Sequence, residues 1–124
     1  MRKSLTSLLI FAFTVTGVSI ASAHTVLIAS NPAKGSTIKV LPTKIILKFA
    51  DPLLTLGKRS INRVVVTNPK SKVVTTGKDI AKGAILTDPM TIANPIVGIY
   101  RVSYRVSAQD GHIVTGSYTF KLQN

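Results

Sequence analysis

The C-terminal part of the chain reads Tyr100-Arg-Val-Ser-Tyr-Arg-Val-Ser-Ala-Gln-Asp110-Gly111-His112 and continues as Ile113-Val-Thr-Gly-Ser-Tyr-Thr-Phe120. In both halves apolar residues alternate with polar ones, a period of two that is typical of strands with one buried face. Between them, Asp110-Gly111 has the composition of a tight turn. The stretch therefore predicts an antiparallel hairpin whose turn carries a carboxylate and an imidazole two residues apart.

The start of the chain has the features of an export signal. It begins Met1-Arg2-Lys3, continues through a short apolar run at residues 8–13, and reaches Ala21-Ser22-Ala23 immediately before His24. A basic start, an apolar middle and an Ala-x-Ala site are typical of a secretory signal peptide, and the run is shorter than the ~20 residues of a membrane-spanning helix. We therefore expect residues 1–23 to be a signal peptide and residues 24–124 to form one small exported domain.

The charge balance is strongly basic. The chain carries 16 Lys and Arg against four acidic residues, and without Arg2 and Lys3 the net charge is about +10. The basic residues are scattered, so we expect a solvated basic surface, with weak binding to anionic membranes or acidic glycans as the more specific alternative. An exported protein has little access to nucleic acid, which we do not expect as a partner. Because the chain contains no Cys, disulfides, thiolate metal sites and Cys nucleophiles are excluded.

Upstream of the hairpin, β-branched and aliphatic runs alternate with turn residues. The runs are residues 25–30, 44–49 and 60–67, with shorter candidates at 73–75 and 84–87, and Asp88-Pro89 and Asn94-Pro95 are expected as turns. About seven short strands without helical periodicity predict an all-β sandwich or Greek-key barrel. The residues expected to be buried are Leu27, Ile45, Leu47, Phe49, Val65, Tyr100, Val102, Tyr104, Tyr118 and Phe120.

The two histidines of the chain are His24 and His112. After cleavage at Ala23, the α-amine and Nδ1 of His24 could chelate one metal ion, and His112 could add a third nitrogen. Nitrogen ligands near a plane, completed by carboxylate oxygen, suit Cu(II) in tetragonal geometry. Zn(II) would accept the same atoms, but it prefers a tetrahedron and usually recruits side chains.

Oxygen ligands would have to come from four aspartates, Asp51, Asp79, Asp88 and Asp110. A protein of this charge repels a dication unless carboxylates lie at the site. Asp110 shares a turn with His112, and Asp51 follows the strand that ends at Phe49, so these two are the candidate ligands. Each also has an ordinary alternative, because Asp51-Pro52 is a common turn initiator and Asp110-Gly111 a common hairpin turn.

Several motifs together resemble the CopC-type periplasmic copper-resistance proteins. They are His24 after the cleavage site, Ser30-Asn-Pro-Ala-x-Gly35-Ser36, Ile46-Leu-Lys-Phe-Ala-Asp51-Pro52, and the hairpin with Asp110-Gly111-His112. The resemblance implies a seven-stranded Greek-key β-barrel of immunoglobulin-like or cupredoxin-like character, located in the periplasm. It also implies a Cu(II) site made by His24, Asp110, His112 and Asp51, and an inner-membrane partner of the CopD type.

Two departures from the family pattern bear on metal binding. Asp51 is one methylene shorter than the Glu that is common at its position. Some members carry a methionine-rich Cu(I) site, but the mature chain has Met90 alone, and thioether ligation of Cu(I) needs several soft ligands, so we expect no such site here.

The function expected from the sequence is Cu(II) binding without catalysis, either to sequester copper or to hand it to a membrane partner. One alternative is a copper oxidase or monooxygenase with a histidine-brace site. It is disfavoured because the chain has no Trp for a glycan-binding surface and because Asp ligands would fill positions that such an enzyme leaves open. The other alternative is an immunoglobulin-like exported domain in which both histidines are incidental.

Overall fold

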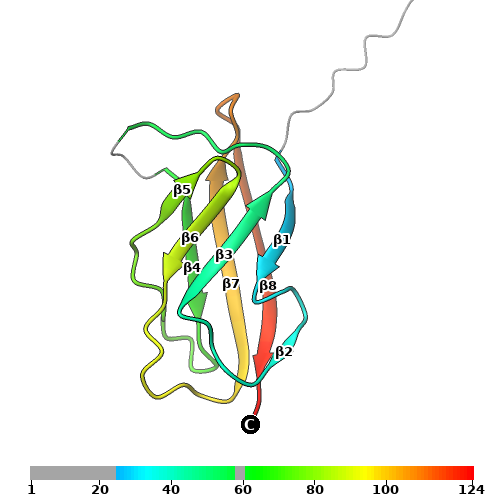
Figure 1. The fold of residues 1–124 in the computed structure, drawn as a ribbon, viewed down its shortest axis with the longest axis vertical. Coiled ribbons are helices and arrows are strands. Elements are labelled where there is room, and N and C mark those ends of the chain that lie inside the picture. The colour runs from blue at the N-terminus through cyan, green and yellow to red at the C-terminus, as the bar shows by residue number, and fades with distance from the viewer. Residues whose placement is uncertain (1–24, 58–60) are drawn as a thin grey trace, which may run out of the picture.

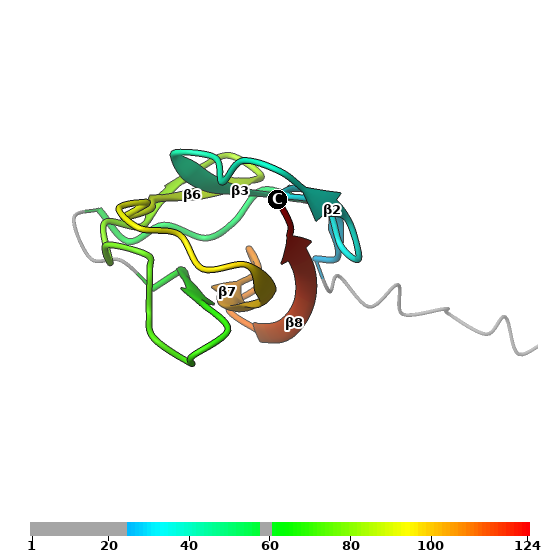
Figure 2. The same ribbon diagram turned by 90° about the horizontal axis from the view of Figure 1, so that it is seen from below.

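The computed structural model describes residues 25–57 and 61–124, so His24 and the expected signal peptide lie outside the described residues. Two four-stranded sheets pack face to face, one with the order β1-β3-β6-β5 and the other with the order β2-β8-β7-β4 (Figure 1). Seen from below, β3 and β6 lie in one layer and β7 and β8 in the other (Figure 2). The strands are β1 (Leu27–Asn31), β2 (Thr37–Ile38), β3 (Lys44–Phe49), β4 (Arg63–Thr67), β5 (Ile80–Lys82), β6 (Ile85–Pro89), β7 (Gly98–Ser107) and β8 (Ile113–Leu122).

The predicted all-β sandwich is confirmed, with eight strands among the described residues in place of about seven. The described residues contain no helix, and accordingly none that could span a membrane. The two-residue β2 and the three-residue β5 were not expected, and residues 73–75 form isolated bridges only. The expected turn at Asp88-Pro89 is wrong, because both residues lie inside β6.

The predicted hairpin is the longest pair of strands in the molecule, ten residues in each of β7 and β8. Tyr100 pairs with Phe120, and their rings stack with centroids 5.2 Å apart. Tyr104 lies opposite Gly116 and contacts the ring of Phe49 edge-on, at a centroid distance of 5.4 Å. These aromatic contacts join β7 to β8 within one sheet and to β3 in the other.

The core lies between the two sheets. Most of the residues predicted to be buried are buried, while Leu27 and Tyr104 are partly buried and pack against the core. Val65 is an incorrect prediction. Val64 and Val66 point inward from β4, and Val65 lies opposite the exposed Ser103 of β7. Three consecutive valines carry no alternation, so the sequence could not determine which of them faces the core.

Candidate metal centre

The turn between β7 and β8 brings Asp110 and His112 together. The Oδ1 atom of Asp110 accepts the main-chain N–H of His112 at 3.0 Å, and Oδ2 lies 2.7 Å from the imidazole Nδ1. Between them, Gly111 has a φ of 86°, a conformation that glycine adopts without strain. The side chains of His112 and Asp110 are 65% and 37% exposed, so the pair is open to solvent.

This pairing has a chemical consequence for metal binding. A carboxylate at Nδ1 favours the tautomer with the proton on that atom, which leaves the lone pair on Nε2. Carboxylate–imidazole pairs of this kind orient a ligating histidine. The turn therefore presents a pre-oriented imidazole together with a carboxylate.

A second group of contacts fixes the chain next to His24. The main-chain N–H of Ala50 donates to the carbonyl of Val26 at 2.8 Å. The hydroxyl of Thr25 donates to the carbonyl of Asp51 and accepts its N–H, both at 3.3 Å. Because Thr25 is 1% exposed, the residue that follows His24 is held in the interior beside Asp51.

The segment that contains Asp51 is joined to the Asp110 turn. Leu53 forms an antiparallel bridge with Ala108, and the N–H of Leu54 donates to the carbonyl of Ser107 at 2.9 Å. Asp51 lies two residues before this bridge and Asp110 two residues after it, so the two antiparallel segments carry both carboxylates toward the same end of the molecule. Figure 1 shows this end, where β3 and β7 finish and β1 and β8 begin.

Two polar side chains that the sequence did not single out hold this junction. The amide of Asn62 donates to the carbonyl of Leu54 at 2.8 Å and accepts the N–H of Ser107 at 2.9 Å, and the residue is 2% exposed. The amide of Gln109 donates to the carbonyl of Leu53 at 3.0 Å. The available signal was the position of Asn62 within residues 60–67, which the sequence predicts to be a strand. An amide side chain buried there needs hydrogen-bond partners.

Among residues 25–57 and 61–124, no group of three or more His, Cys, Asp or Glu could hold a metal ion. Of the predicted ligands, the structure thus brings Asp110 and His112 together, while Asp51 stands at the same end without joining them in one cluster. His24 lies outside the described residues. The four-residue ligand set accordingly stays a prediction.

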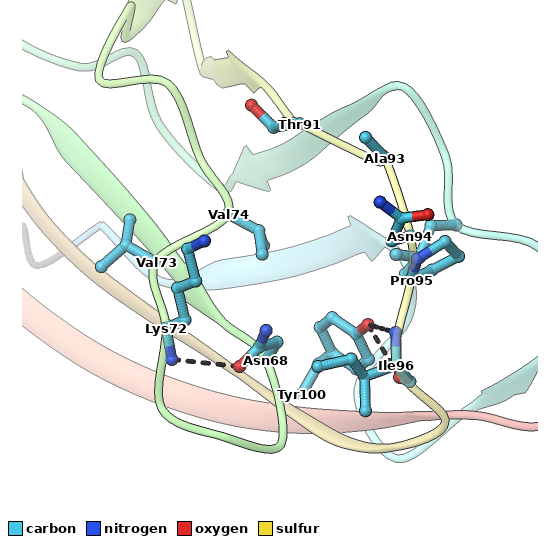
Figure 3. Close-up of a pocket in the computed structure, with 11 residues that line it drawn as sticks. Asn68, Lys72, Val73, Val74, Thr91, Ala93, Asn94, Pro95, Ile96 and Tyr100 are labelled. Carbon is cyan, nitrogen blue, oxygen red and sulfur yellow. Dashed lines mark hydrogen bonds between the residues drawn. The ribbon is translucent and has the colours of Figure 1, made fainter.

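A pocket of about 230 Å³ is lined by residues that include Tyr100 near the start of β7, away from the Asp110 turn that follows the end of this strand. Figure 3 shows its lining. Its lining contains no His, Asp, Glu or Cys. The Oδ1 atom of Asn68 accepts the N–H groups of Lys70 and Lys72, and the Tyr100 hydroxyl bonds to the main chain of Ile96. This pocket offers a divalent metal ion no carboxylate or imidazole.

Comparison with known proteins identifies the family. The family model of the CopC domain matches residues 27–123 of this chain. This chain belongs to the CopC family. The chain is 32% identical over 108 residues to Copper resistance protein C of Pseudomonas syringae pv. tomato, and the alignment covers 85% of each protein.

Solved structures of CopC proteins have the same fold. The crystal structure of CopC from Methylosinus trichosporium OB3b has a TM-score of 0.68 at 24% identity, covering 81% of this chain and 94% of that one. PcoC, a methionine-rich copper resistance protein from Escherichia coli, has a TM-score of 0.63 at 26% identity, covering 82% of this chain and all of PcoC. In this CopC domain the one methionine among the described residues, Met90, is 7% exposed and packs in the core.

Proposed function

We propose that this CopC chain is exported to the periplasm, where it binds Cu(II) as cargo and contributes to copper resistance. The family match and the curated relative named for copper resistance support this role. The bound ion would be sequestered or passed to an integral inner-membrane partner of the CopD type, without chemical turnover.

The observation that carries the proposal is the attachment of Thr25 to Asp51, and of the Asp51 segment to the turn of Asp110 and His112. Consecutive Cα atoms of a chain lie about 3.8 Å apart across a trans peptide bond. A mature N-terminus at His24 would therefore begin at the end of the molecule that carries Asp51, Asp110 and His112.

The proposed site combines the α-amine and imidazole of His24 with the imidazole of His112 and the carboxylates of Asp110 and Asp51. Nitrogen donors near a plane with added oxygen suit Cu(II). The carboxylates also offset the repulsion between a dication and a mature chain with a net charge of about +10. Because the amine and imidazoles must be deprotonated to bind, copper affinity falls as the pH decreases through their titration range.

The position of Met90 separates this protein from methionine-rich copper carriers. Its thioether is buried among apolar side chains, and Cu(I) requires several soft ligands. We therefore assign the copper chemistry of this chain to its nitrogen and oxygen donors and to the Cu(II) state.

The test is a Cu(II) titration followed by electron paramagnetic resonance on two forms of the protein. One form begins at His24, and the matched form carries one additional residue before it, which removes the α-amine from the chelate. We expect one equivalent of tetragonal, nitrogen-rich Cu(II) in the first form and a weaker or altered signal in the second.

Identical spectra from the two forms would show that the amine is not a ligand. If neither form bound one specific equivalent, the copper assignment would fail and the domain would be an exported immunoglobulin-like module with incidental histidines.

A further inference from the structure

The outer face of the β1-β3-β6-β5 sheet has an unusual composition. Strand pairing places Lys48, Ile85 and Lys82 side by side across β3, β6 and β5, and places Ile46, Thr87 and Ile80 in the next row. We name this surface the lysine–isoleucine face. It consists of Ala29, Asn31, Lys44, Ile46, Lys48, Ile80, Lys82, Ile85, Thr87 and Pro89.

Burial shows that these side chains point away from the core. Their strand neighbours Ile45, Leu47 and Leu86 are 0% exposed, whereas Ile80 is 61% and Ile85 is 41% exposed. The three lysines are exposed and no acidic residue belongs to the face. The surface is therefore cationic and aliphatic at the same time, and Figure 1 looks directly onto it.

Two shallow depressions extend the face along β1. One of about 240 Å³ is lined by residues 29–31, Ile46, Lys48 and Ile85, and one of about 320 Å³ is lined by residues 27–30, Ala33 and Lys34. They share Ala29 and Ser30, and the second adds Ile28, which is 57% exposed. Apolar recesses bordered by lysines thus run from β6 to the edge of the sheet.

The outer face of the other sheet provides a comparison. It is also basic, but its centre is covered by hydroxyl groups rather than isoleucines. Its central residues are Arg101, Ser103, Arg105, Thr115, Ser117 and Thr119, with Lys121 toward the end of β8. Net charge is therefore common to both faces. The second face also exposes Ile99, which pairs with Lys121, and Ile113, but both lie where β7 and β8 begin. The first face differs because its exposed Ile85 lies between Lys48 and Lys82 across three strands.

We propose that the lysine–isoleucine face docks onto an anionic phospholipid surface. Lysine ammonium groups reach phosphates while their methylene stems lie along apolar surface, and exposed isoleucines enter the boundary between headgroups and acyl chains. A polyanionic glycan would use the charges but would leave the isoleucines in water. The attraction of the three lysines to anionic lipid should together strengthen vesicle binding roughly 100-fold.

Docking through this face would also position the proposed copper site. Lys48 lies in the row nearest to Asp51, and the Asp110 turn adjoins the same end of β3. The face would lie on the bilayer with the copper-binding end beside the headgroups, within reach of an integral partner. This orientation rests on the delivery role proposed above, whereas docking itself requires no copper.

The experiment measures binding of the copper-free exported protein to vesicles of phosphatidylcholine mixed with phosphatidylglycerol, by co-sedimentation at low and high salt. We expect binding to the mixed vesicles and little to pure phosphatidylcholine. The variant Lys44→Gln, Lys48→Gln, Lys82→Gln should bind roughly 100-fold more weakly.

The matched control Arg101→Gln, Arg105→Gln, Lys121→Gln removes the same charge from the other face. We expect the affinity of this control for mixed vesicles to fall by less than about tenfold, because charges facing away from the bilayer are screened within about one Debye length. Equal losses in both variants would show that net charge, rather than this face, drives binding, and would overturn the proposal.

A second variant, Ile80→Ser with Ile85→Ser, separates a bilayer from a soluble polyanion. We expect it to weaken vesicle binding, most clearly at high salt, and to leave heparin binding unchanged. If the variant bound vesicles as tightly as the unmodified protein, the occupant would be a polyanion and the proposal would be wrong. Cu(II) titration of every variant should match the unmodified protein, so failure of docking and failure of copper binding are distinguishable.

Discussion

The four aspartates of the chain form two pairs with different environments. Asp88 is 0% exposed, and its oxygens accept the N–H and hydroxyl of Thr76 at 3.0 and 2.8 Å and the N–H of Gly77 at 3.0 Å. Asp79 accepts the N–H of Val64 at 2.8 Å. This pair holds residues 76–79 against β6 and against the outer edge of β4.

Asp51 and Asp110 are exposed, and they stand where β3 and β7 end. Asp110 bonds to the main chain and imidazole of His112, and the main chain of Asp51 bonds to Thr25. This difference shows that the hydrogen-bond partners of a carboxylate indicate whether it stabilises the fold or is available as a metal ligand. Main-chain donors from a distant segment indicate a structural acceptor, whereas an exposed imidazole partner leaves the pair able to bind a metal ion.

Substituting Asn for Asp at three of these positions tests the comparison, and the largest effect is expected at Asp88. In Asp88→Asn an amide NH₂ would face the N–H of Gly77, and two donors cannot bond to each other. We expect urea unfolding to show a loss of about 2–3 kcal/mol. Cu(II) affinity should be unchanged. If Asp88→Asn lowered Cu(II) affinity as much as Asp110→Asn, the distinction between structural and metal-binding aspartates would be wrong.

Asp110→Asn keeps an oxygen for the N–H of His112 and removes the negative charge. We expect Cu(II) affinity to fall roughly 10- to 100-fold, since the imidazole loses its carboxylate partner and the metal a charge. The stability of the copper-free protein should change by less than about 0.5 kcal/mol, as at other exposed sites. Competition titration with a chelator measures the first quantity, and unchanged affinity would reduce Asp110 to a turn residue.

Asp79→Asn should give the smallest effect and one that depends on pH. Burial raises the pKa of Asp79 above 3.8, although the hydrogen bond from Val64 opposes the shift. A raised pKa favours the protonated folded state, so the stability it contributes is present below pH 3.8 and is lost as the pH rises through the raised value.

The Asn variant cannot ionise and avoids this loss. Its stability relative to the unmodified protein should therefore increase from acid to neutral pH, by less than about 1 kcal/mol because Asp79 is partly exposed. Urea unfolding at a series of pH values measures the difference, and a difference that stays constant with pH would contradict the burial of this carboxylate.

The period-two alternation in residues 98–122 was sufficient to predict the central hairpin and its buried residues. Alternation failed at Val64, Val65 and Val66, where three identical side chains leave the register to the neighbouring β7. It also failed at β2 and β5, whose short strands are stabilised by pairing with β8 and β6 rather than by their own pattern. At Asp88-Pro89, hydrogen bonds from the N–H groups of Thr76 and Gly77 to Asp88 outweigh the local preference for a turn.

For the candidate site, the sequence by itself predicted the ligand types, because imidazole, amine and carboxylate chemistry belongs to individual residues. It also placed Asp110 and His112 together, since a turn of three residues is local. Only the tertiary structure decided that Thr25 is held at Asp51, and that Asn62 and Gln109 join that segment to the Asp110 turn. These contacts join residues far apart in sequence, and their partners are main-chain groups, which every residue carries and no sequence pattern distinguishes.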